Sequence, residues 1–140
     1  MTMKIAQAVF ALILMGTGTA LADTKVLDRH GVTIKAGDLE GVMADYAPDA
    51  VVVTPPGAMS PTGVFAGKDV RKLFAILTNK ENNPAVRTME TRYVKVNADT
   101  TIMHWVQHKG TPKQVSGHDV FVIRGGKILF QTVSIDPPKK

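Results

Sequence analysis

The stretch GHDVFVIRGGKI, residues 117–128, decides the fold of this chain. β-branched and aromatic residues flank the pair Gly125-Gly126, a composition typical of two strands joined by a tight hairpin turn. Turn residues also occur upstream, at Asn97-Ala98-Asp99 and at Gly110-Thr111-Pro112. The second half of the chain therefore predicts consecutive hairpins built from four β-runs, at Val86–Val96, Thr101–Lys109, Lys113–Arg124 and Lys127–Ile135.

The residues before this β-region predict helices. Val26, Leu27 and Ile34 fall on one helical stripe that also carries His30, and Gly37 is expected to end that helix. Two more helices are predicted from the spacing of their apolar residues. The second, capped by Asp38, uses Leu39, Val42, Met43 and Tyr46, and the third uses Val70, Leu73, Phe74 and Leu77.

The segment between the second and third helices predicts a short strand and a loop. Ala50–Thr54 reads as the strand, and the Pro- and Gly-rich stretch Pro55–Gly67 reads as the loop, with an extended piece at Val64-Phe65. Helices followed by an antiparallel meander indicate an α+β fold. We expect a curved antiparallel sheet with about three N-terminal helices packed on its concave side.

The first 22 residues predict a cleavable signal peptide. Lys4 precedes the apolar run Ile5–Met15, and Ala20-Leu21-Ala22 has the form of a signal-peptidase site. We therefore expect a periplasmic or secreted protein with one domain over residues 23–140. The apolar run is shorter than the roughly 20 residues that span a bilayer, so no membrane association is expected after cleavage.

Composition argues against several classes of function. The net charge of +5 is modest and its basic residues are scattered, which does not favour nucleic-acid binding. The sequence contains no Cys, no phosphate-binding glycine loop, no GxSxG and no HExxH. We expect a small-molecule ligand, no nucleic-acid partner, no metal and no cofactor.

The middle hairpin predicts a register. With Gly110-Thr111 in the turn, His104 faces Gly117 and Ile102 faces Asp119. Asp119 then stands on a largely apolar face of the sheet, with His104 as its diagonal neighbour at roughly 7 Å between Cα atoms.

The order of these elements and three motifs resemble the superfamily of nuclear transport factor two and ketosteroid isomerase. The motifs are AGDLEGVMADYAPDAVVV at 36–53, GKDVRKLF at 67–74 and GHDVFVIRGGKI at 117–128, and the nearest likeness is to SnoaL-like polyketide cyclases. The resemblance implies a cone-shaped sheet around a pocket that helices close, and often a homodimer. It says little about function, because one fold serves many chemistries.

The resemblance also assigns residues. Ketosteroid isomerases keep a general-base Asp where this chain has Thr54, just before Pro55-Pro56-Gly57. A neutral hydroxyl cannot take a proton from carbon as a carboxylate does, so we expect no steroid isomerase activity. Thr54 then either caps its turn or touches a ligand. The two oxyanion-hole positions correspond to His30 and Asp119.

The catalytic candidates are therefore Asp119, His30 and, from the register, His104. The residues expected to line the pocket are Tyr46, Thr54, Phe74, Ile102, Val115, Gly117, Phe121 and Gln131. The loop Pro55–Gly67 is a candidate lid over this pocket.

Three functions remain open. The first is a protein that binds a small apolar or carbonyl-containing ligand without transforming it. The second is a cofactor-independent isomerase, cyclase or dehydratase that works through Asp119 with His30 or His104. The third is a homodimeric interaction module whose pocket is vestigial.

Overall fold

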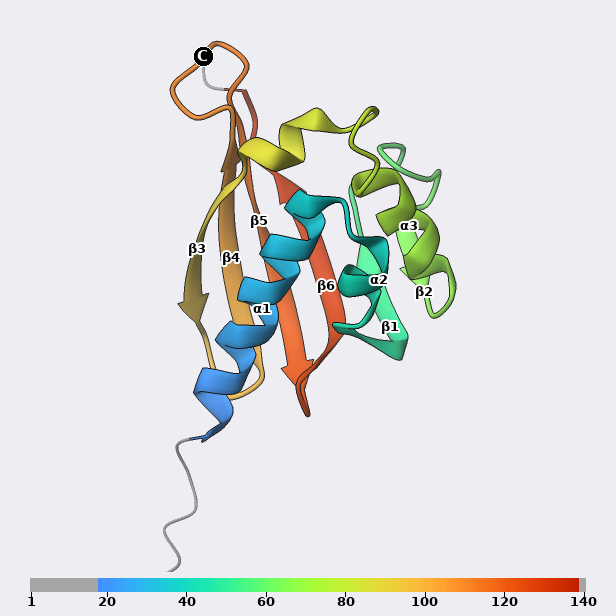
Figure 1. The fold of residues 1–140 in the computed structure, drawn as a ribbon, viewed down its shortest axis with the longest axis vertical. Helices are drawn as coiled ribbons and strands as arrows, with labels where there is room; N and C mark the ends of the chain where they lie inside the picture. The colour runs from blue at the N-terminus through green and yellow to red at the C-terminus, as the bar shows by residue number, and fades with distance from the viewer. Residues whose placement is uncertain (1–17, 139–140) are drawn as a thin grey trace, which may run out of the picture.

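Three α-helices lie on one face of a curved, unclosed six-stranded sheet in the computed structural model, which describes residues 18–138 (Figure 1). The helices are α1 Gly18–Ala36, α2 Leu39–Met43 and α3 Asp69–Leu77, with a short 3-10 helix, η1, at Pro84–Thr88. The strands are β1 Tyr46–Val53, β2 Val64–Ala66, β3 Glu90–Lys95, β4 Thr100–Gln107, β5 Val115–Arg124 and β6 Lys127–Ile135. The predicted signal peptide lies outside the described residues, except for residues 18–22, which begin α1. Within 18–138, no helix has the length and apolar character needed to cross a membrane.

The strand order is β2-β1-β6-β5-β4-β3. Strands β3 to β6 pair antiparallel with their sequence neighbours, which confirms the predicted meander. However, β1 pairs parallel with β6, so the expectation of a wholly antiparallel sheet is wrong at this pair. The cause is topological: β1 and β6 are not joined by a hairpin, because β2, α3 and the meander separate them in the chain.

The helix signals are largely confirmed. α1 buries Val26, Leu27 and Ile34, and Gly37 ends it with φ +72. Asp38 caps α2 by accepting a hydrogen bond from the Gly41 N–H at 2.9 Å. The predicted continuation of this helix to Tyr46 is wrong, since Tyr46 begins β1.

The β-run predicted from Val86 begins later, at Glu90. Pro84 starts η1, which continues to Thr88, and the fixed φ of proline suits the first turn of a helix. The extended piece expected at Val64-Phe65 is confirmed as β2, which pairs with β1.

β4 and β5 pair one residue away from the predicted register. Met103 faces Asp119, and His104 faces His118. The prediction assumed a connection with an even number of residues, whereas residues 108–114, an odd number, join the strands. A slip of one residue turns every side chain of a strand to the other face, so His104 leaves the face that Asp119 occupies.

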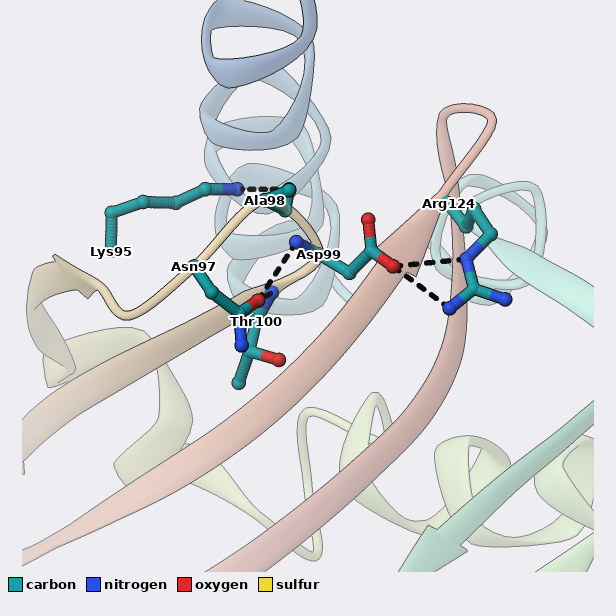
Figure 2. A network of polar contacts seen from close by, with 6 residues as sticks. All are labelled: Lys95, Asn97, Ala98, Asp99, Thr100 and Arg124. Atoms are coloured by element: carbon teal, nitrogen blue, oxygen red, sulfur yellow. Dashed lines mark hydrogen bonds and ion pairs between the residues drawn. The ribbon is translucent and has the colours of Figure 1, made fainter.

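A polar network joins the β3–β4 turn to the far end of β5 (Figure 2). Asn97 Oδ1 accepts hydrogen bonds from the N–H groups of Asp99 and Thr100 at 3.0 and 2.9 Å. The Asp99 carboxylate accepts two from Arg124, at 3.1 and 2.8 Å, and the Ile123 N–H donates to the Asp99 carbonyl at 2.8 Å. These contacts hold the end of β5 against the turn and so help to fix the observed register.

Gly31, inside α1, is a position where alanine should stabilise the protein. An added Cβ would meet only the Tyr93 hydroxyl, at the ordinary contact distance of 3.8 Å. Glycine within a helix costs roughly 0.5–1 kcal/mol relative to alanine, so Gly31→Ala should raise the free energy of unfolding by about that amount in urea denaturation. Gly37→Ala is the matched control and should destabilise, because Gly37 has φ +72 and its Cβ would lie 2.8 Å from the Thr78 carbonyl oxygen. A loss of stability in Gly31→Ala would contradict this account of α1.

Candidate functional site

An apolar cavity of about 240 Å³, here called the inner cavity, lies between the helices and the sheet. Its walls come from α1, α3, η1, the loop after β1, and strands β4, β5 and β6. The polar lining residues are His30, Asn83, Gln107, Asp119 and Gln131, and none of the described lining residues is Lys or Arg. The apolar ones are Ile34, Met59, Phe74, Leu77, Val86, Met89, Met103, Trp105, Val115, Val133 and Ile135.

Asp119 enters this cavity from β5 and is only 5% exposed. Trp105 Nε1 donates a hydrogen bond to its Oδ1 at 2.7 Å, and Gln131 Nε2 donates to its Oδ2 at 2.7 Å. The Tyr46 hydroxyl donates in turn to Gln131 Oε1. Burial raises the pKa of Asp119 to about 6, against the lowering effect of these two bonds and of His118. Asp119 can therefore exchange a proton close to neutral pH.

His30 lines the same cavity from α1 and is 3% exposed. Its ring meets those of Tyr46, Phe74 and Phe121 edge-on, with centroid distances of 5.6, 5.6 and 6.0 Å. Burial lowers the pKa of His30 to about 4, so the imidazole is neutral at pH 7. Its Nδ1 is buried without a hydrogen-bond partner among the described residues, a state that costs about 1–3 kcal/mol. Nδ1 has almost no accessible surface, so a ligand group in the cavity would recover part of that cost only if the imidazole turned.

Gly117 allows Trp105 to reach Asp119. Gly117 of β5 is paired with Trp105 of β4. A Cβ on Gly117 would lie 2.5 and 2.9 Å from Trp105 Cζ2 and Cε2, so the indole occupies the space that a side chain at 117 would need. Sequence reasoning missed Trp105 as a partner of Asp119, and the register error explains this omission; it also missed the polar lining residues Asn83 and Gln107.

The structure brings most of the predicted site together. His30, Phe74, Val115, Asp119 and Gln131 line the inner cavity. Three others are buried next to it without being part of its lining. They are Tyr46 and Phe121, whose rings contact His30, and Gly117 under the indole of Trp105.

The predicted positions of His104 and Ile102 are wrong. Both lie on the outer face of the sheet, where His104 is exposed and faces His118 with ring centroids 6.1 Å apart. The register slip described above is the cause, and it separates His104 from the cavity that holds Asp119. Among the described residues, no three His, Asp or Glu side chains are grouped so that they could hold a metal ion.

Thr54 closes a loop. It is buried at the end of β1, and its hydroxyl donates to the Gly63 carbonyl at 3.3 Å while its N–H donates to the same oxygen at 2.8 Å. Thr54 is not a lining residue of the inner cavity, so these contacts favour its role as a turn cap. The loop contributes Met59 to the cavity wall. Its movement as a lid stays a prediction.

Comparison with known proteins adds a family match and a shared fold. Residues 28–130 match the family model described as a SnoaL-like domain. Among solved structures, an NTF-2 like protein of unknown function from Burkholderia xenovorans LB400 is 16% identical, with 87% of this chain and 88% of that chain covered and a TM-score of 0.65. A de novo designed protein with a curved beta-sheet is 22% identical, with 84% and 87% covered and a TM-score of 0.64.

The epoxide hydrolase/cyclase-like enzyme SalBIII, which has a role in pyran ring formation in the polyether salinomycin, is also similar. It is 15% identical, with 84% of this chain and 92% of that chain covered and a TM-score of 0.64. No curated protein sequence matches the chain. At these identities the structural likeness shows the fold alone.

Proposed function

The chain belongs to the SnoaL-like domain family, as its motifs predict, and from this premise we propose that it binds a compact, neutral, mainly apolar ligand carrying a carbonyl or hydroxyl group. The observation that carries the proposal is the apolar cavity beside His30, whose Nδ1 lacks a partner among the described residues. Ligand sites commonly exceed roughly 300 Å³. A cavity of about 240 Å³ therefore favours a small ligand, such as one substituted ring.

The charge of the cavity supports a neutral ligand. Above pH 6 the Asp119 carboxyl is ionised, and the described lining contains no Lys or Arg to balance it, while His30 is neutral at that pH. An anionic ligand would be repelled and would lose its hydration without compensation. A hydroxyl group, in contrast, can donate to the Asp119 carboxylate.

Asp119 also favours a second candidate function, cofactor-independent proton transfer of the isomerase, cyclase or dehydratase type. A carboxyl whose pKa is about 6 can both accept and donate a proton near neutral pH, and the neutral His30 lies in the same cavity. The ketosteroid isomerase reaction is not part of this proposal, because Thr54 supplies no carboxylate and its hydroxyl is bonded to Gly63.

Two further proposals come from the sequence. The pattern over residues 1–22 supports cleavage after Ala22 and export as a periplasmic or secreted protein, and N-terminal sequencing of the mature protein would test the cleavage. Homodimerisation, and with it the alternative of an interaction module, is supported by apolar residues on the outer face of the sheet such as Ile102, Val120 and Val122. Sedimentation analysis would test it.

The binding proposal has a direct assay, because Trp105 is the single Trp of the chain and lines the inner cavity. We expect phenol to change Trp105 fluorescence saturably, with a Kd of about 1 mM or tighter, equivalent to about −4 kcal/mol. The anionic analogue benzoate should not bind. His30→Leu should weaken phenol binding at least about fivefold through loss of one hydrogen bond, whereas the outer-face control His104→Leu should not. Equal binding of phenol and benzoate would contradict the proposal.

A further inference from the structure

A second hollow, here called the outer groove, is lined by residues of the β4–β5 loop and of the C-terminal segment. Figure 1 shows these two segments at the same end of the molecule. Its volume is about 620 Å³. Its apolar lining residues are Pro112 and Val115, from the β4–β5 loop and the start of β5, and Ile135, Pro137 and Pro138, from the end of β6 and the segment that follows it. The outer groove is therefore larger than the inner cavity and has a substantial apolar surface.

The two hollows adjoin. Val115 and Ile135 line both of them, and these side chains are 41% and 52% exposed. Val115 is two residues from Gly117, which pairs with Ile135, so both side chains belong to the sheet face that carries Asp119. Val115 and Ile135 thus form the common boundary of the inner cavity and the outer groove.

Hydrogen bonds hold both walls of the outer groove in place. Ser116 Oγ donates to Asp136 Oδ2 at 2.7 Å, and the Asp136 N–H donates to the Ser116 carbonyl at 2.9 Å, which ties the C-terminal segment to β5. On the other side, the Gly110 N–H donates to Gln114 Oε1 at 2.8 Å. The groove is a formed feature of this end of the sheet.

We propose that the inner cavity and the outer groove form one elongated site for a neutral amphiphile, a cyclic or aromatic alcohol with an unbranched alkyl tail that passes between Val115 and Ile135. The inference rests on the proposed function, because the ring occupies the inner cavity. The outer groove alone falls within the roughly 300–1,000 Å³ of common ligand sites, and the inner cavity alone does not. No described lining residue of either hollow is Lys or Arg, which favours a neutral head group over a carboxylate.

The test compares phenol, 4-butylphenol and 4-hexylphenol by isothermal titration calorimetry. Each methylene group buried in the groove should raise affinity about fourfold. Ile135→Trp narrows the junction, so the gain in affinity from phenol to 4-hexylphenol, both measured on this variant, should be at least about tenfold smaller than in the wild-type protein. Val115→Trp should reduce the gain in the same way. Agreement between the two variants would show that the effect comes from the junction and not from one substituted position. Val94→Trp, at a strand valine that is 37% exposed and lines neither hollow, is the matched control.

The outcomes separate the two proposals. If phenol binds but 4-hexylphenol binds no more tightly, the elongated site is wrong and the compact ligand site stands. An unchanged gain in both tryptophan variants, or equal affinity for 4-hexylbenzoate and 4-hexylphenol, overturns the elongated site as well. If phenol itself fails to bind the wild-type protein, the proposed function fails, and the extension fails with it.

Discussion

Replacing Gly117 by alanine should cost roughly 3 kcal/mol of stability, the upper range for overpacking a well-packed core. The added Cβ would lie 2.5 Å from Trp105 Cζ2 and closer still to the Ser134 carbonyl oxygen. The indole can rotate away only by losing its hydrogen bond to Asp119. The Ser134 oxygen belongs to the backbone of β6, so relief on that side requires the sheet itself to shift. Urea denaturation followed by circular dichroism measures the loss.

Two comparisons identify the source of this cost. Gly31→Ala is the control for a glycine-to-alanine change in ordinary backbone, where the Cβ has space. Trp105→Phe removes the contact with Cζ2, so the double variant Gly117→Ala/Trp105→Phe should lose less stability than the sum of the single variants. Part of the cost should remain, because the Ser134 contact is unaffected. A stability change below about 0.5 kcal/mol in Gly117→Ala would show that Trp105 does not lie over position 117.

Local patterns predicted the parts of this fold that depend on local interactions. The apolar stripe of α1 places His30 toward the sheet, and turn residues delimit the strands of the meander. The cap formed by Asp38 and the stop at Gly37 are also local, and both are confirmed. The register error concerns the pairing of β4 with β5. It does not change the face of the sheet on which Asp119 lies, because that face depends on the position of Asp119 within β5.

The rest depends on contacts between distant residues. The register of β4 depends on whether the loop 108–114 holds an odd or an even number of residues, and side-chain bonds such as that of Gln114 decide this. The bond between Tyr46 and Gln131 requires β1 to lie beside β6, a parallel pairing that no single segment indicates. Trp105 could have been found only by matching the largest side chain of β4 with the single glycine of β5.

At pH 5, folding removes a proton from His30 and adds one to Asp119. In the unfolded chain the imidazole, with a pKa of 6.5, is charged and the carboxyl, with a pKa of 3.8, is ionised. In the folded protein the pKa of His30 is about 4 and that of Asp119 about 6, so the imidazole is neutral and the carboxyl protonated. The two states bind the same number of protons at these groups between about pH 4 and pH 6. Their contributions to the pH dependence of stability therefore cancel in the wild-type protein.

Removing one of the two groups should reveal the pH dependence that the other contributes to stability. In Asp119→Asn only His30 remains, the unfolded state binds more protons, and stability relative to wild type should rise as pH increases from 4.5 to 6. In His30→Leu only Asp119 remains, the folded state binds more protons, and relative stability should fall over the same range. Each change should amount to roughly 1–2 kcal/mol, measured by urea denaturation at several pH values.

Both variants should fold, so the comparison is practicable. An Asn at 119 can still accept from Trp105, and rotation of the Gln131 amide lets Gln131 accept from the new amide and donate to Tyr46. Leu at 30 fits among the rings of Tyr46, Phe74 and Phe121. His104→Leu, which removes a histidine outside the cavity, is the matched control. Opposite slopes require that folding lowers the pKa of His30 and raises that of Asp119, so slopes of the same sign in the two variants would contradict the burial of these two groups, on which the ligand proposals depend.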